Sequence, residues 1–83
     1  MTVETEQMSD IDALRQEIDR LDAEILAAVK RRTEVSQEIG RARMASGGTR
    51  LVHSREMKVI ERYSELGPEG KDLAMLLLRM GRG

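Results

Sequence analysis

Apolar side chains recur every three or four residues over the first half of the chain. The positions are Ile11, Leu14, Ile18, Leu21, Ile25, Ala28, Val35, Ile39 and Ala42. This spacing is a heptad pattern, typical of a helix that packs along one stripe against another helix. It predicts one long helix from about Ser9, its expected cap, to Met44. The polar residues 1–8 show no periodicity, and we expect them to form a disordered tail.

Two shorter helices are predicted after the long one. Gly47-Gly48 ends the long helix, because adjacent glycines favour a turn. A second helix is expected to start with Ser54 as its cap and to stop at Gly67-Pro68, and a third to run from about Glu69 to Met80. The predicted fold class is therefore all-α, one long helix plus two short helices, in a single domain over residues 9–83.

Each short helix has an apolar stripe that predicts which side chains it buries. The second helix is expected to bury either Met57, Ile60 and Tyr63 or Val59, Tyr63 and Leu66. The third is expected to bury Leu73, Leu76, Leu77 and Met80.

The long helix is too long for the globule it would belong to. Roughly 36 residues at about 1.5 Å each give about 54 Å, whereas a compact chain of this length has a radius of gyration of about 12 Å. The chain also has no Phe, no Trp and a single Tyr, so its own core is small. We therefore expect a second copy to cover the outer half, in an intertwined homodimer about a twofold axis.

Charge and composition exclude several classes of function. The chain is 35% charged with a formal net charge of −1, which argues against binding to nucleic acid. It has no Cys and one His, His53, so we expect no disulfide and no transition-metal site. We identify no signal peptide and no membrane span. A cytoplasmic protein is the simplest interpretation.

The placement of arginine is the most informative polar feature. Arg32 occupies a position of the apolar stripe, where a charge destabilises packing unless an anion meets it. Arg15 and Arg43 flank the same stripe, and Arg55-Glu56 opens the second helix. One interpretation is that these arginines form ion pairs between helices. The other is that several guanidinium groups converge on a small dianion, since their planar forks suit carboxylates.

These residues resemble the all-helical class of chorismate mutases, most closely the short intracellular form of actinobacteria. The resemblance covers the chain from about Asp10 onward. It rests on Leu14-Arg15, Ile18-Asp19, Leu21-Asp22, Lys30-Arg31-Arg32, Ile39-Gly40-Arg41-Ala42-Arg43 and Ser54-Arg55-Glu56.

The resemblance implies an intertwined helical dimer with two pockets that convert chorismate to prephenate, on the route to Phe and Tyr. This intramolecular pericyclic reaction needs no cofactor and no nucleophile. By the same resemblance, the partner's Arg15 and Arg32 would grip the substrate carboxylates, and Arg43, a position where many relatives have Lys, would reach the ether oxygen. Glu56 would accept a hydrogen bond from the ring hydroxyl, and Arg55 would be a further pocket arginine.

The chain departs from well-known relatives at two places. Val52 stands where those relatives have an acid, and the third helix is apolar and short where theirs is longer and carries a polar residue, commonly Gln. The pocket is therefore expected to be incomplete in isolation. For this short subclass, the resemblance implies activation in a complex with 3-deoxy-arabino-heptulosonate-7-phosphate (DAHP) synthase.

Two other functions stay open at this point. One is a non-catalytic helical dimer that serves as an assembly or regulatory subunit. The other is an isochorismate-type pyruvate lyase, which shares the fold. The pocket residues alone do not distinguish such a lyase well from a mutase.

Overall fold

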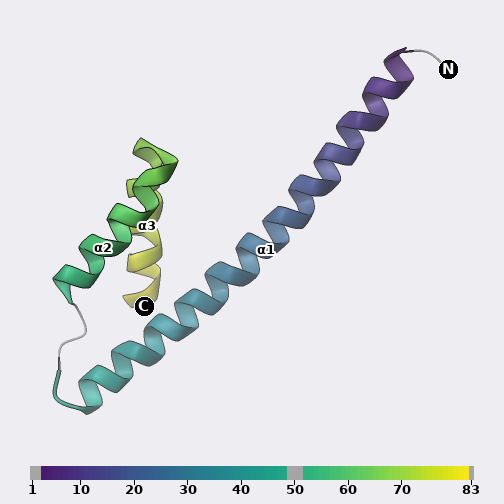
Figure 1. Ribbon diagram of the computed structural model, residues 1–83. Coiled ribbons are helices and arrows are strands. Elements are labelled where there is room, and N and C mark those ends of the chain that lie inside the picture. Colours follow the sequence, from purple (N-terminus) through teal and green to yellow (C-terminus); the bar gives the residue numbers. More distant parts are fainter. Residues whose placement is uncertain (1–2, 49–51, 83) are drawn as a thin grey trace.

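The described part of the chain folds into three α-helices and one short 3-10 helix. The computed structural model describes residues 3–48 and 52–82, of which residues 3–9 are described by their backbone alone. The elements, in order, are α1 (Val3–Ala45), α2 (His53–Tyr63), η1 (Ser64–Leu66) and α3 (Pro68–Arg82) (Figure 1). All elements of the described ranges are helical, which confirms the all-α prediction of one long helix and two short ones.

Helix α1 is longer than the apolar pattern predicts. It contains 43 residues, which corresponds to about 65 Å, and the radius of gyration is 18.9 Å, well above the value of a compact chain. The backbone is helical from Val3, so Ser9 lies inside the helix and its predicted role as the cap is wrong. The segment 4–8 contains no Gly and no Pro, so its sequence does not stop a helix from extending into the expected tail.

The two turns between the helices depend on glycine. After Ala45, the amides of Gly47 and Gly48 donate to the carbonyls of Met44 and Arg43, and Gly47 has a φ of 84°. Gly67, with a φ of 89°, separates η1 from α3. Both have a positive φ, which glycine adopts without a steric penalty. The predicted end of the long helix is confirmed, whereas α2 ends at Tyr63 and the helical path continues as η1 before it stops at Gly67.

Helix α2 begins two residues earlier than predicted. Val52, not Ser54, occupies the cap position, and the cap makes no side-chain hydrogen bond. The amides of Arg55 and Glu56 both donate to the backbone carbonyl of Val52 instead. Because Val52 has an extended backbone and its own carbonyl starts the helix, the prediction of a serine cap was wrong.

Helix α3 packs against both α1 and α2 through its small residues. Its buried positions are Gly70, Ala74, Leu77 and Gly81. A Cβ on Gly70 would lie 2.8 Å from the carbonyl carbon of Tyr63, so only glycine permits this approach. Of the predicted stripe, only Leu77 faces the core. Leu73, Leu76 and Met80 are exposed. The face of α3 that carries the small residues turns inward instead, because small side chains let α3 pack closer to its neighbours.

The core that the chain forms by itself is small. Among the described residues, the buried apolar side chains are Val59, Ala74 and Leu77. On α2, Ile60 and Tyr63 are half-buried and Met57 is exposed, and Leu66 on η1 is exposed as well. Neither stripe predicted for the second helix is therefore buried as a whole. Tertiary packing, not the periodicity of α2 alone, decides which of its side chains are covered.

The apolar stripe on the first part of α1 is uncovered in the single chain. Five of its large side chains are exposed: Ile11, Leu14, Ile18, Leu21 and Ile25. Figure 1 shows this part of α1 projecting well beyond α2 and α3. Within the part of the chain that the structure describes, no helix is both long enough and apolar enough to cross a membrane.

Candidate functional site

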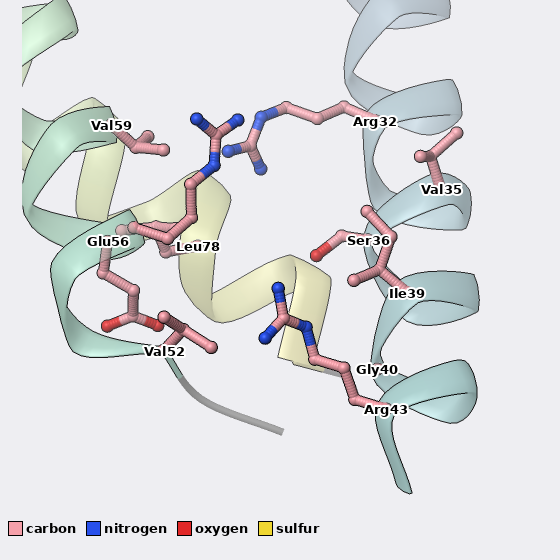
Figure 2. A pocket seen from close by; sticks show the side chains of 11 residues that line it. Arg32, Val35, Ser36, Ile39, Gly40, Arg43, Val52, Glu56, Val59 and Leu78 are labelled. Carbon is pink, nitrogen blue, oxygen red and sulfur yellow. The ribbon is translucent and has the colours of Figure 1, made fainter. Parts of the chain in front are cut away.

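A cavity of about 470 Å³ lies between the last third of α1 and the start of α2. Its volume is within the range of pockets that hold small molecules. Helix α3 contacts both α1 and α2 and contributes Leu78 to the lining (Figure 2). The other lining residues are Arg32, Val35, Ser36, Ile39, Gly40 and Arg43 from α1, and Val52, Arg55, Glu56 and Val59 from the N-terminal part of α2 and its cap.

The α1 wall is the continuation of the apolar stripe that the sequence predicted. Arg32, Val35, Ile39 and Arg43 follow at steps of three or four residues, which places them on one face of the helix. Gly40 is buried on the same face. The first part of the stripe is therefore an uncovered apolar surface, and its last part is a pocket wall with a guanidinium at each end.

The charges around this cavity are predominantly positive. Among the described lining residues, three arginines, Arg32, Arg43 and Arg55, accompany one carboxylate, Glu56, which gives these residues a formal charge of +2. In Figure 2, Arg32 and Arg43 extend from α1 towards α2, and Glu56 and Val52 lie on the opposite wall. Most of the other lining residues are apolar, so the partly buried Arg32, Arg43 and Glu56 act in surroundings where electrostatic attraction is stronger than in water.

Arg32 is held in place by the backbone of α3. Its Nη1 donates a hydrogen bond of 3.2 Å to the carbonyl oxygen of Leu77, and its side chain is half-buried. A guanidinium has five N–H donors, so this contact leaves donors of Arg32 available to the cavity. Among the described residues, Arg32 is therefore held at the cavity wall by a neutral acceptor and not by a carboxylate that would cancel its charge.

Glu56 has a charged partner on the other side of the wall. Nη2 of Arg82, near the end of α3, lies 2.6 Å from Oε2 of Glu56. A second, smaller cavity of about 200 Å³ lies on this side and is lined by both residues. Glu56 therefore stands between the two cavities.

Five of the six predicted site residues come together in this structure. Arg32, Arg43, Val52, Arg55 and Glu56 all line the larger cavity.

Arg15, the sixth, does not line it, because it precedes Arg32 by 17 residues, or about 26 Å along the axis of α1. The sequence prediction assigned Arg15 to the pocket of a second chain, so its place in the site stays a prediction.

Sequence reasoning missed most of the apolar lining and the role of α3. Val35 and Ile39 were identified as stripe positions but not as pocket wall, while Ser36 and Leu78 were not identified at all. The spacing from Arg32 to Ser36, one helical turn, was the available signal. Nothing in the spacing indicated that Arg82 would reach Glu56.

The fold and the cavity together define a class of protein. It is a small all-helical protein with a pocket between its helices, and the pocket combines several guanidinium groups with an apolar wall, as suits an anionic small molecule. The family model for chorismate mutase type II matches residues 14–79 of this chain. The chain belongs to the chorismate mutase type II family.

Relatives of known function are similar over almost the whole chain. The intracellular chorismate mutase of Mycobacterium tuberculosis is 79% identical over 81 residues, which are 98% of this chain and 77% of that protein. The intracellular chorismate mutase of Mycolicibacterium smegmatis is 80% identical over 75 residues, 89% of this chain and 72% of that protein. A solved structure of the non-covalent complex of DAHP synthase and chorismate mutase from Corynebacterium glutamicum, with a bound transition state analog, contains a chain that is 59% identical. It superposes with a TM-score of 0.86 and covers 93% of this chain and 94% of that one.

Proposed function

We propose that the larger cavity is the site at which this chain rearranges chorismate to prephenate, in the synthesis of Phe and Tyr. The observation that carries the proposal is the formal charge of +2 that the described lining residues give to a largely apolar pocket of about 470 Å³. Chorismate is a dicarboxylate, so two excess guanidinium charges match it. Membership of the chorismate mutase type II family supports the same activity.

The lining provides what an intramolecular rearrangement requires. The substrate must be held in its reactive conformation, and charge that develops at the breaking ether bond must be stabilised. Arg32 grips a carboxylate, and Arg43, on the same helix face, reaches the ether oxygen. Because negative charge grows on that oxygen only in the transition state, the contact with Arg43 accelerates the reaction rather than only tightening binding.

The remaining residues orient the ring. Glu56 accepts a hydrogen bond from the ring hydroxyl, and Arg55 adds a further positive charge to the pocket. Val52 closes the wall opposite Arg43 with an apolar group. None of these steps needs a proton transfer, a nucleophile or a cofactor.

A second copy of the chain completes the pocket. The exposed apolar stripe at the start of α1 is the kind of surface that a twofold partner covers. Arg15 lies on this part of α1. In an intertwined homodimer, α1 of the partner runs past the cavity and brings its own Arg15 to the substrate.

The proposal extends to a protein partner and to the compartment. We propose that the chain is activated in a complex with DAHP synthase, because the similar Corynebacterium glutamicum chain was solved in such a complex. The mycobacterial relatives are called intracellular, and we place the chain in the cytoplasm.

Replacing Arg43 tests the activity and its mechanism. Arg43→Ala is expected to lower kcat by about 100- to 1000-fold, the loss typical for one donor that stabilises a developing anion, with a smaller change in KM. Arg41→Ala is the matched control, since Arg41 is on the same helix but outside the cavity lining. The assay follows loss of chorismate and appearance of prephenate. Equal activity of the two variants would reject the role of Arg43.

Two further measurements separate the alternatives. Incubation with isochorismate and detection of pyruvate identifies a lyase, whereas conversion of chorismate without pyruvate identifies a mutase. Titration of the purified chain with DAHP synthase is expected to raise kcat/KM. An unchanged kcat/KM at saturating synthase would reject the activation, and absence of turnover with every substrate would favour an assembly subunit.

A further inference from the structure

Arg82 contacts Glu56, the one acidic residue among the described residues that line the larger cavity, from outside that cavity. Its Nη2 lies 2.6 Å from Oε2 of Glu56. Arg82 lines only the smaller cavity, whereas Glu56 lines both. The guanidinium of Arg82 therefore approaches the carboxylate from behind, on the face turned away from the proposed substrate site.

We propose that Arg82 is a positioning residue that holds the Glu56 carboxylate at the pocket wall. The proposal rests on the proposed function, because it concerns how Glu56 stays available to the ring hydroxyl. The sequence pattern and the position of Arg82 near the end of α3 suggest no role for Arg82. The geometry of its ion pair with Glu56 indicates the positioning role.

The charges of the cavity explain why Glu56 needs such a partner. Three guanidinium groups line the same cavity as this carboxylate. A glutamate with no other partner is attracted to them and forms a charge-assisted pair, which cancels positive charge that the substrate requires. Arg82 competes with the cavity arginines for Glu56 and keeps them available to the dianion.

The contact also leaves a free acceptor. Arg82 bonds to Oε2, and an ionised carboxylate has a second oxygen with its own lone pairs. Oε1 of Glu56 therefore remains able to accept the hydrogen bond from the substrate hydroxyl.

Contacts between the last turn of α3 and α1 give Arg82 a defined position. Gly81, directly before it, is buried against Ser36 of α1, and a Cβ on Gly81 would lie 2.8 Å from the Cβ of Ser36. One turn earlier, the carbonyl of Leu77 accepts from Arg32. Both contacts fix the last turn of α3 against the wall of the larger cavity.

The test is a double-mutant cycle between Arg82 and Glu56, measured on the full chain with and without DAHP synthase. Arg82→Ala is expected to lower kcat/KM about tenfold or more, in the range for loss of a hydrogen bond between charged groups, with both a lower kcat and a higher KM. Arg82→Lys is expected to restore part of the loss, because it keeps the charge. In a Glu56→Gln background, Arg82→Ala is expected to change kcat/KM less than twofold.

Arg79→Ala is the matched control, because Arg79 lines the same smaller cavity on α3 but is not a lining residue of the larger one. It is expected to change kcat/KM less than twofold. An equal loss from Arg82→Ala in the wild-type and the Glu56→Gln backgrounds would show that Arg82 only supports the fold. No loss in either background would equally overturn the proposal.

A crystal structure of the Arg82→Ala variant tests the positioning of the Glu56 carboxylate independently of any activity measurement. The Glu56 carboxylate is expected to turn towards the arginines of the larger cavity. If the wild-type chain proved inactive on chorismate, the proposed function would fail, while this orientation would still decide the role of Arg82. An unchanged position of Glu56 in the variant would overturn the proposal.

Discussion

The substitution Gly81→Ala tests quantitatively whether the contact between Gly81 and Ser36 sets the geometry of the pocket. An alanine at 81 would place its Cβ 2.8 Å from the Cβ of Ser36, whereas carbon atoms in favourable contact are about 3.5–4.0 Å apart. The end of α3 must therefore move by about 1 Å. Such overpacking typically destabilises by about 1–3 kcal/mol, and the better helix propensity of alanine offsets about 1 kcal/mol of that.

The effect of Gly81→Ala on activity is expected to exceed its effect on stability. A displacement of about 1 Å at a substrate site lowers the rate by as much as about 100-fold, and Ser36 lines the larger cavity. We expect a loss of kcat/KM of tenfold or more, with a free energy of unfolding that falls by only about 1 kcal/mol. The measurements are steady-state conversion of chorismate and urea unfolding at a fixed chain concentration.

Removing the opposing side chain provides the control. In the double variant Gly81→Ala/Ser36→Gly the clash disappears, so its kcat/KM is expected to match that of Ser36→Gly alone. Two results would refute the idea that packing of α3 against Ser36 sets the pocket geometry. One is a wild-type kcat/KM for Gly81→Ala, and the other is a double variant as impaired as Gly81→Ala.

Three further predictions concern the charges and the uncovered stripe. Arg32→Leu is expected to abolish activity but to leave the dimer equally or more stable, because it removes a half-buried charge; dissociation of this variant in sedimentation would contradict the ligand role. Ile18→Asp is expected to weaken association by about 1.5–3 kcal/mol per copy, the value of one buried aliphatic side chain, and a dimer of wild-type stability in sedimentation would exclude the stripe as the interface. Raising the salt from 0.1 to 1 M shortens the Debye length from about 10 to about 3 Å, so kcat/KM is expected to fall severalfold through KM; a flat salt profile would contradict capture of a dianion by guanidinium groups.

The fold could be predicted largely because its signals are local. The heptad spacing from Ile11 to Ala42 specifies one long helix, and Gly47 and Gly67 mark turns that need a positive φ. The exact starts of the helices could not be predicted. Val52 begins α2 through its backbone carbonyl alone, a contact that depends on the path of the chain and not on a side chain.

The candidate site was predictable in its charged members and in Val52. Arg32 was identified because a charge in an apolar stripe needs an explanation. Arg43, Arg55 and Glu56 were identified from their placement, and the resemblance supplied their roles and Val52. The contribution of α3 was missed, since its buried face is made of small residues such as Ala74 that produce a weak apolar signal. The pairing of Arg82 with Glu56 joins residues 26 positions apart, and such a contact follows from tertiary packing alone.

The first part of α1 is uncovered and its last part forms a pocket wall, and this division affects how long a single copy of the chain survives in a cell. Among the described residues, the fold buries only the apolar side chains of Val59, Ala74 and Leu77, so a solitary copy has little to hold it against degradation by proteases. In the proposed homodimer, a newly made copy would gain protection when it meets another. At low expression, the number of complete pockets would then grow with the square of the amount of chain synthesised, so a modest change in expression would produce a much larger change in flux.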